Sequence, residues 1–372
     1  MKLILLLSAF IVANVCLSQV NSSIQHDGET RTFAYYTPSG WDQSQQLPVL
    51  FVLHGLTQTG NGLMGITGFN DIAEANNFIV CYPDGINNAW NANMSLTVSS
   101  ADDLGFIEAL TMHFQTDFNT NPLKQYLSGF SNGGYMINKI TCESNICYAG
   151  IASVSGNMTD TVYNNCNPIH PTSILHIHGT LDPVVAYNGS ASTGVSVDAS
   201  MEKWRLLLNC DSSPTIVAMA NPNIFDFSSP ERITYANCDK ELELIKVTGG
   251  GHQWPGIVTL IGGLGTINMD FYSPQIIWEF LDGKSCPSSL EIEPIEQSEI
   301  KVHPNPIIDK FVIESSEIIQ SVTIFNLTGE AIVTFDVNAS KKRLDISNLT
   351  SGVYFVQYYN TGELRQVKIV KL

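Results

Sequence analysis

Short apolar runs alternate with longer amphipathic stretches between about residue 30 and residue 283. The run LPVLFVL is apolar at almost every position, which predicts a strand buried on both faces of a sheet. The runs that we expect to form strands are Leu47–Leu53, Phe78–Tyr82, Gln125–Gly129, Gly150–Val154, Ile174–His178 and Glu241–Thr248. The stretches that we expect to form helices are Asp102–Asn119, Asn132–Ile140, Ser200–Leu208 and Ser273–Asp282. This alternation predicts an α/β domain with a mainly parallel sheet over residues 19–283.

The pattern changes after Asp282. Residues 284–299 are rich in Ser, Pro and Glu and are predicted to form a linker. From residue 300 to residue 372 the apolar runs are short and are separated by turn signals such as Thr328-Gly329. The expected strands there are Phe311–Glu314, Ser321–Asn326, Ala331–Phe335, Gly352–Tyr359 and Gln366–Val370. These features predict a second, small domain that is an all-β sandwich.

The N-terminus has the pattern of an export signal. Met1-Lys2 is followed by the apolar run Leu3–Val15 and a segment of small residues, so we expect residues 1–18 to be a signal peptide. The run is shorter than the roughly 20 residues that span a bilayer, and no other stretch competes, so no transmembrane segment is expected in the mature protein. A lipid anchor on Cys16 is the alternative, although Val15 is an unfavourable residue before a lipidated cysteine.

Composition excludes several classes of protein. The chain has 372 residues, of which 44% are hydrophobic, so it has enough apolar side chains to form a folded core. Charged residues make up only 14%, and 35 acidic residues against 18 basic ones give a net charge of −17. Because nucleic-acid binding needs clustered Lys and Arg, we expect no nucleic-acid partner.

Export makes disulfides permissible, and the mature chain would keep seven of the eight cysteines. Cys81 lies in an apolar run and is predicted to be a buried core thiol. The other six allow fifteen pairings, among which spacing does not choose. No Cys/His cluster has the spacing of a zinc site, and we expect neither a metal nor another cofactor.

The segment GFSNGG (129–134) carries the strongest chemical signal. It follows an expected strand and precedes an expected helix, which is the context of a nucleophile elbow, where a Ser sits on a sharp turn flanked by Gly. The short pattern alone is weak, because it also arises by chance. In this context it predicts Ser131 as a nucleophile, with a helix cap as the alternative role.

Acyl transfer also needs a base, a carboxylate that orients the base, and donors to the oxyanion. Asp182 follows the strand Ile174–His178, and His252 follows the strand Glu241–Thr248, so both lie where α/β sheets place their sites. The order Ser, Asp, His is that of α/β-hydrolases. We therefore predict a triad of Ser131, Asp182 and His252, with a turn former as the alternative role of Asp182.

The expected oxyanion donors are the backbone N–H groups of Leu56, which follows His54-Gly55 at the end of a buried strand, and of Asn132. Trp90 and Trp254 are candidates for substrate binding, with burial in the core as the alternative. His176 and His178 are predicted core histidines. A metal site made by these two and Asp182 would need a further strong ligand, which is not evident. The rival carboxylates have the patterns of turns or helix starts and are Asp84, Asp102, Asp103 and Asp160.

Six blocks between about residue 30 and residue 283 resemble, in order, the secreted polyhydroxybutyrate depolymerase-like and feruloyl or acetyl-xylan esterase family of α/β-hydrolases. The blocks are VLHGLTQT (52–59), YPDGINNAWN (82–91), DDLGFIEAL (102–110), GFSNGGYM (129–136), HIHGTLDPVVAYNG (176–189) and GGGHQWPG (249–256). The resemblance implies the α/β-hydrolase fold, the same triad, ester substrates and a disulfide between Cys210 and Cys238. Many relatives have Cys at the position of Leu56, a departure that leaves the backbone donor intact.

Residues 300–372 resemble the C-terminal sorting domain of the type IX secretion system. The matching segments are KVHPNPIIDKFVI (301–313), VTIFNLTGE (322–330), LDISNLTSGVYFV (344–356) and VKIVKL (367–372). The resemblance implies export across both membranes of a Bacteroidetes-type bacterium, with the type IX machinery as a partner. The mature protein would then be extracellular or attached to the outer cell surface.

Together these patterns predict an extracellular serine esterase that acts on carboxylic esters of, or attached to, a polymer. Candidate esters are feruloyl or acetyl groups on plant polysaccharide and hydroxyalkanoate polyesters. A neutral polymer is favoured, because residues 1–287 have 24 acidic and 10 basic residues and the predicted site segments contain neither Lys nor Arg. The alternatives are a serine peptidase of the same fold and a polymer-binding protein without catalysis.

Overall fold

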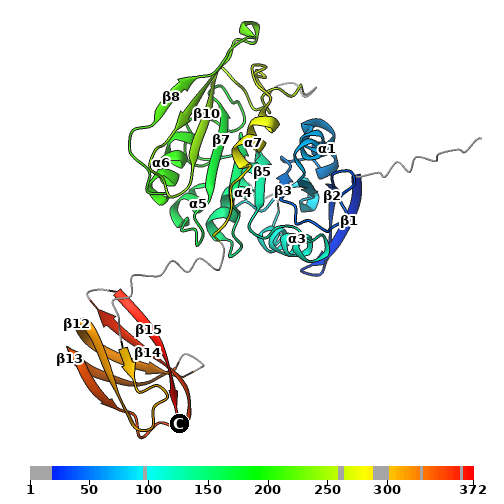
Figure 1. Ribbon diagram of the computed structural model, residues 1–372. Coiled ribbons are helices and arrows are strands. Elements are labelled where there is room, and N and C mark those ends of the chain that lie inside the picture. Colours follow the sequence, from blue (N-terminus) through cyan, green and yellow to red (C-terminus); the bar gives the residue numbers. More distant parts are fainter. Residues whose placement is uncertain (1–18, 95–98, 259–263, 288–300, 327–329, 361–362) are drawn as a thin grey trace, which may run out of the picture. The chain divides into compact units, whose positions relative to one another are not determined.

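The computed structural model describes residues 19–94, 99–258, 264–287, 301–326, 330–360 and 363–372. The chain divides into two units, Met1–Ser288 and Ser289–Leu372, which are described separately (Figure 1). The predicted signal peptide, residues 1–18, and most of the predicted linker, residues 284–299, lie outside the described residues.

The first unit is built on a sheet of ten strands in the order β1-β2-β4-β3-β5-β6-β7-β10-β9-β8. The strands are β1 (Gln19–His26), β2 (Glu29–Tyr36), β3 (Val49–Leu53), β4 (Ile79–Pro83), β5 (Gln125–Phe130), β6 (Gly150–Val154), β7 (Ser173–Gly179), β8 (Thr215–Ala218), β9 (Ser229–Thr234) and β10 (Leu242–Thr248). The six central strands are parallel, and the two strands at each edge are antiparallel. The predicted α/β class with a mainly parallel sheet is confirmed, although the complete sheet is mixed.

Helices cover both faces of this sheet (Figure 1). They are α1 (Gly60–Thr67), α2 (Phe69–Asn76), α3 (Asp103–Asp117), α4 (Asn132–Glu143), α5 (Asp160–Asn165), α6 (Val197–Leu207) and α7 (Ser273–Leu281), with short 3-10 turns at Ile86–Asn88 (η1) and Ile224–Asp226 (η2). Alternate residues of β3 enter different cores: Phe51 packs with residues of α3 and α4, and Leu50 packs with residues of α1, α2 and α7. The continuous apolar run of β3 is therefore buried on both faces, as predicted.

The edge hairpin of β1 and β2 was not among the expected strands. Its turn is Asp27-Gly28, and both residues have positive φ, 50° and 77°. A two-residue turn of this kind favours Asp-Gly because its twist matches that of the flanking strands. The Asp-Gly dipeptide was therefore a usable signal for a hairpin. In contrast, β8 is exposed at all four positions and shows no alternation of buried and exposed residues from which a strand could be predicted.

The second unit consists of antiparallel strands that share one core. They are β11 (Lys301–His303), β12 (Lys310–Phe325), β13 (Ala331–Asp345), β14 (Gly352–Asn360) and β15 (Glu363–Lys371). The predicted all-β class is confirmed. Two of the expected strands, 311–314 and 321–326, correspond to parts of β12, which ends at Phe325 and continues through register shifts between Glu314 and Ser321.

The six paired cysteines form Cys142–Cys166, Cys147–Cys286 and Cys210–Cys238. The pairing of Cys210 with Cys238 that the resemblance implied is confirmed. Cys81 is a free, buried thiol on β4, and burial raises its pKa well above the usual value. It is thus an unreactive core residue, as predicted.

Candidate active site

Ser131 lies on the sharp turn between β5 and α4. Its backbone has φ 52° and ψ −119°, a conformation that non-glycine residues rarely adopt. Small neighbours are required for this turn, because a Cβ added to Gly129 would lie 2.4 Å from the carbonyl oxygen of Gly133. A Cβ on Gly133 would lie 2.3 Å from the carbonyl oxygen of Leu53 on β3. The segment has the geometry of a nucleophile elbow.

The structure brings the three predicted triad residues together at the carboxyl ends of β5, β7 and β10. His252 Nε2 lies 2.9 Å from Ser131 Oγ, and His252 Nδ1 lies 2.8 Å from Asp182 Oδ2. The other carboxylate oxygen of Asp182 accepts hydrogen bonds from the backbone N–H groups of Val184 (2.8 Å) and Val185 (2.7 Å). Since the carboxylate accepts at Nδ1, His252 Nε2 is the nitrogen free to accept the Ser131 proton.

The predicted oxyanion loop lies next to the predicted nucleophile, since a Cβ on Gly55 would lie 3.4 Å from Ser131 Cβ. His54 holds this loop. Its Nε2 accepts from the backbone N–H of Gly85 (3.0 Å), so Nδ1 carries the proton and donates to the Gly55 carbonyl oxygen (2.8 Å). Because the Gly55–Leu56 peptide bond is planar and trans, the Leu56 N–H points in the direction opposite to the Gly55 carbonyl group that His54 holds.

Asn132 follows Ser131 and is the first residue of α4, where the backbone N–H has no partner within the helix. Its side chain has a role that no sequence pattern indicated. Asn132 Oδ1 accepts from the backbone N–H of Trp90 (2.7 Å), and Nδ2 donates to the Trp90 carbonyl oxygen (3.1 Å). The amide therefore attaches the loop after β4 to the elbow.

Trp90 and Trp254, the candidates for substrate binding, have buried rings with exposed fractions of 0% and 1%, which agrees with the alternative role in the core. Trp90 Nε1 donates to the His54 carbonyl oxygen (2.9 Å), and Trp254 stacks on Phe130 at 5.7 Å. Both rings pack behind the site and support its loops.

His176 and His178 are buried side by side beneath Asp182. His178 Nε2 is 2.8 Å from the Val185 carbonyl oxygen and 3.5 Å from Asp182 Oδ2, so this nitrogen carries the proton. His178 Nδ1 then accepts from His176 Nε2 at 3.0 Å. Burial lowers the pKa of both imidazoles, which keeps them neutral. Over the described part of the chain, no group of three or more His, Cys, Asp or Glu residues has the arrangement of a metal site.

The rival carboxylates have other partners. Asp84 accepts from the Gly60 backbone N–H (2.7 Å), and Asp103 pairs with Arg31. Asp102 accepts from the Gly105 backbone N–H at the start of α3 (3.0 Å), and Asp160 lies in the first turn of α5. Asp182 is thus the carboxylate that contacts His252 in the described structure.

Because three histidines are buried in the first unit, we expect acid to lower its free energy of unfolding. Burial lowers the pKa of His54, as it does for His176 and His178. Below the unfolded pKa of about 6.5, the unfolded chain takes up protons that the folded chain does not, so stability present above that pH is lost as the pH falls. We expect the free energy of unfolding to fall by about 3 kcal/mol between pH 7 and pH 5.5. Urea titrations followed by tryptophan fluorescence at these two pH values measure the change, and equal values at both would contradict the prediction.

The doubly covered parallel sheet, the elbow and the Ser–His–Asp arrangement define an α/β-hydrolase. Residues 122–210 match the family described as "Phospholipase/Carboxylesterase", and residues 301–372 match the "Secretion system C-terminal sorting domain". The first unit is therefore a carboxylic ester hydrolase of the α/β-hydrolase class, and the second is a sorting domain of the kind used in type IX secretion. In the described residues, no helix is both long and apolar enough to cross a membrane.

Individual relatives agree with this assignment. The bifunctional acetylxylan esterase/xylanase XynS20E of Neocallimastix patriciarum is 25% identical over 63% of this chain and 32% of its own length. Feruloyl esterase B of Piromyces equi is 25% identical over 58% of this chain and 41% of its own. The chain thus spans less than half of either relative. The acetyl xylan esterase structure from Aspergillus awamori superimposes with a TM-score of 0.51 at 16% identity, covering 70% of this chain and 98% of that one, and shares the fold.

Proposed function

We propose that the protein is an exported serine esterase that cleaves carboxylic esters on a neutral polymer through an acyl-enzyme. The observation that carries this proposal is the hydrogen-bonded series Ser131–His252–Asp182 at the elbow. The three residues come from loops after three different strands, and each donor–acceptor distance is within hydrogen-bond range.

In the first half-reaction, Ser131 Oγ attacks the ester carbonyl carbon while His252 Nε2 takes the hydroxyl proton. The negative charge that develops on the carbonyl oxygen is stabilised by the backbone N–H groups of Leu56 and Asn132. His252 then gives its proton to the leaving alcohol, and the acyl group remains on Ser131.

In the second half-reaction, water replaces the alcohol. His252 takes a proton from the water, which attacks the acyl carbon, and then returns the proton to Ser131 as the acid leaves. Asp182 stabilises the imidazolium in both halves and holds its tautomer, because its second oxygen is fixed by the N–H groups of Val184 and Val185.

The choice of substrate rests on charge and on the relatives. Residues 1–287 carry 24 acidic and 10 basic residues, a charge that disfavours polyanionic chains such as pectate. The names of two relatives, an acetylxylan esterase and a feruloyl esterase, favour acetyl and feruloyl esters as substrates. Export would begin with the predicted signal peptide, residues 1–18, and place the enzyme outside the cell or on its surface by way of residues 301–372.

A substrate panel tests the function. We expect purified protein to release acid from acetylated xylan or methyl ferulate at least tenfold faster, per enzyme, than from polyhydroxybutyrate or from a peptide anilide. The measurement is product release by chromatography under the same buffer conditions, with the Ser131→Ala protein as the blank. Faster cleavage of the peptide anilide would contradict the proposal and favour a peptidase. Faster cleavage of polyhydroxybutyrate would retain the esterase but assign it to polyesters.

A further inference from the structure

His178 is a buried histidine to which the proposed mechanism gives no role. It lies on β7, four residues before Asp182, and its exposed fraction is 1%. Burying a polar ring is unfavourable unless its nitrogens find hydrogen-bond partners. Both nitrogens of His178 have such partners, and the contacts of one of them lead directly to Asp182.

The Nε2 side of His178 holds the turn that carries Asp182. This nitrogen donates to the carbonyl oxygen of Val185 at 2.8 Å. The backbone N–H of the same Val185 donates to Asp182 Oδ1 at 2.7 Å, so His178 fixes the residue that orients the carboxylate. The Nε2–H also lies 3.5 Å from Asp182 Oδ2, which is the oxygen that faces His252 Nδ1.

The other nitrogen of His178 fixes the tautomer of its ring. A carbonyl oxygen only accepts, so Nε2 must carry the proton, and Nδ1 of the neutral imidazole is then an acceptor. His176 Nε2 donates to this Nδ1 at 3.0 Å, and the two rings stack with their centres 5.2 Å apart. The Tyr187 ring packs edge-on against His178 at 5.9 Å. Packing and hydrogen bonds therefore hold His178 in one orientation, with its donor towards the turn.

The first half of the same turn is bonded to the segment after β10 that carries His252. There the Leu181 backbone N–H donates to the Gly250 carbonyl oxygen at 2.9 Å. His178 holds the second half of the turn through Val185. These two attachments together set where the turn lies relative to His252.

We propose that His178 is a positioning residue for the proposed triad, because its Nε2–H fixes the turn that holds the Asp182 carboxylate against His252 Nδ1. The proposal rests on the proposed esterase function and adds a supporting residue to the same site. A displacement of about 1 Å in such a support costs about 10²-fold in rate. Because the His178 ring is buried, its loss should lower kcat and leave KM nearly unchanged.

Substitution of His178 by each of the two side-chain amides tests this role. The Asn amide reaches only to the position of Nδ1, so His178→Asn keeps an acceptor for His176 but loses the donor to Val185. The Gln amide extends to the position of Nε2, so His178→Gln restores that donor. In the full-length protein, we expect His178→Asn to lower kcat for p-nitrophenyl acetate about 10²-fold and to change KM by less than about threefold. His178→Gln should stay within about tenfold of the wild-type kcat.

The proton between His252 Nδ1 and Asp182 gives a second readout. Hydrogen bonds to a carboxylate are strong, and their protons resonate far downfield in proton NMR. We expect the downfield signal that His252→Ala lacks to be lost in His178→Asn and present in His178→Gln. The matched control is His113→Asn on α3, where the imidazole lies 2.8 Å from Asp117. This control should keep both the wild-type kcat and the signal.

The outcomes separate the positioning role from the function that it serves. If wild-type protein is active and folded His178→Asn keeps the wild-type kcat, or if folded His178→Gln loses more than about tenfold, the positioning role is wrong and the esterase function stands. The Gln criterion also decides the matter if near-ultraviolet circular dichroism shows that His178→Asn does not fold. If wild-type protein hydrolyses no ester, the proposed function fails. The downfield signal then tests the positioning role by itself, and an unchanged signal in His178→Asn would overturn it.

Discussion

Replacing Ser131 with Ala is expected to lower kcat for p-nitrophenyl acetate by about 10⁵-fold. The substitution removes the hydroxyl that lies 2.9 Å from His252 Nε2 and leaves no atom to carry the acyl group. The proposed oxyanion donors remain, since they belong to the backbone of Leu56 and Asn132, so some acceleration over water should persist. The measurement is the rate of p-nitrophenolate release, with near-ultraviolet circular dichroism as the check that the variant is folded.

Ser128 offers a matched control on the same strand. Its Oγ donates to the Ala152 carbonyl oxygen (3.0 Å), away from His252, so Ser128→Ala should retain activity within about tenfold. The His252→Ala substitution should lower kcat nearly as much as Ser131→Ala does. The effects of replacing members of such a triad are strongly non-additive, because the residues act as a unit. A Ser131→Ala protein that keeps a tenth of the wild-type rate would overturn the mechanism.

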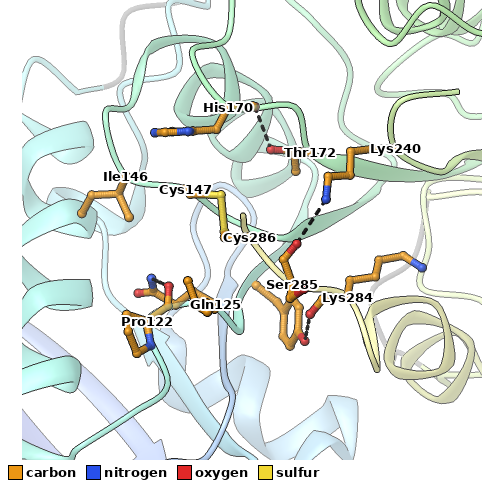
Figure 2. The surroundings of a disulfide bond; sticks show 12 residues. Pro122, Gln125, Ile146, Cys147, His170, Thr172, Lys240, Lys284, Ser285 and Cys286 are labelled. Carbon is orange, nitrogen blue, oxygen red and sulfur yellow. Dashed lines mark hydrogen bonds between the residues drawn. A yellow bond between two sulfur atoms is a disulfide. The ribbon is translucent and has the colours of Figure 1, made fainter. Parts of the chain in front are cut away.

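Removing the disulfide Cys147–Cys286 is expected to give the largest loss of stability. The bond joins residues 139 positions apart, and opening so long a loop restores conformational freedom to the unfolded chain. Figure 2 shows Cys286 in the segment after α7, where the Ser285 carbonyl oxygen accepts from Lys240 Nζ at 3.2 Å. We expect Cys147→Ala/Cys286→Ala to lower the free energy of unfolding of the first unit by about 4 kcal/mol.

Tryptophan fluorescence in urea isolates this effect, because all five tryptophans lie before residue 288 and the second unit has none. The matched control is Cys142→Ala/Cys166→Ala, which opens a disulfide between residues only 24 positions apart. The free energy of unfolding should fall by about 1.5 kcal/mol less in this control, since loop entropy grows slowly with length. A loss below 1 kcal/mol for the Cys147–Cys286 pair would show that the bond does not constrain the unfolded chain as expected.

The sequence by itself determined the central part of the fold and which three residues are proposed to react. The buried strand β3 has an uninterrupted apolar run, and Ser131, Asp182 and His252 each follow a strand whose pattern is local. Parallel strands place their carboxyl ends at one edge, so the order Ser, Asp, His was enough to expect that the three meet. The cysteine pairing Cys210–Cys238 followed from resemblance and not from any local pattern.

The tertiary structure alone decided what depends on contacts between distant segments. Trp90 and Trp254 are buried because they pack against His54 and Phe130, respectively. Spacing along the chain does not determine whether such a ring lies in the core or lines a binding site. The same holds for the pairing of Cys147 with Cys286 and for the Asn132 amide that fixes the loop after β4. The Arg31 Nε–H, which has no hydrogen-bond partner among the described residues, was also invisible in the sequence, because only the folded structure shows which groups surround it.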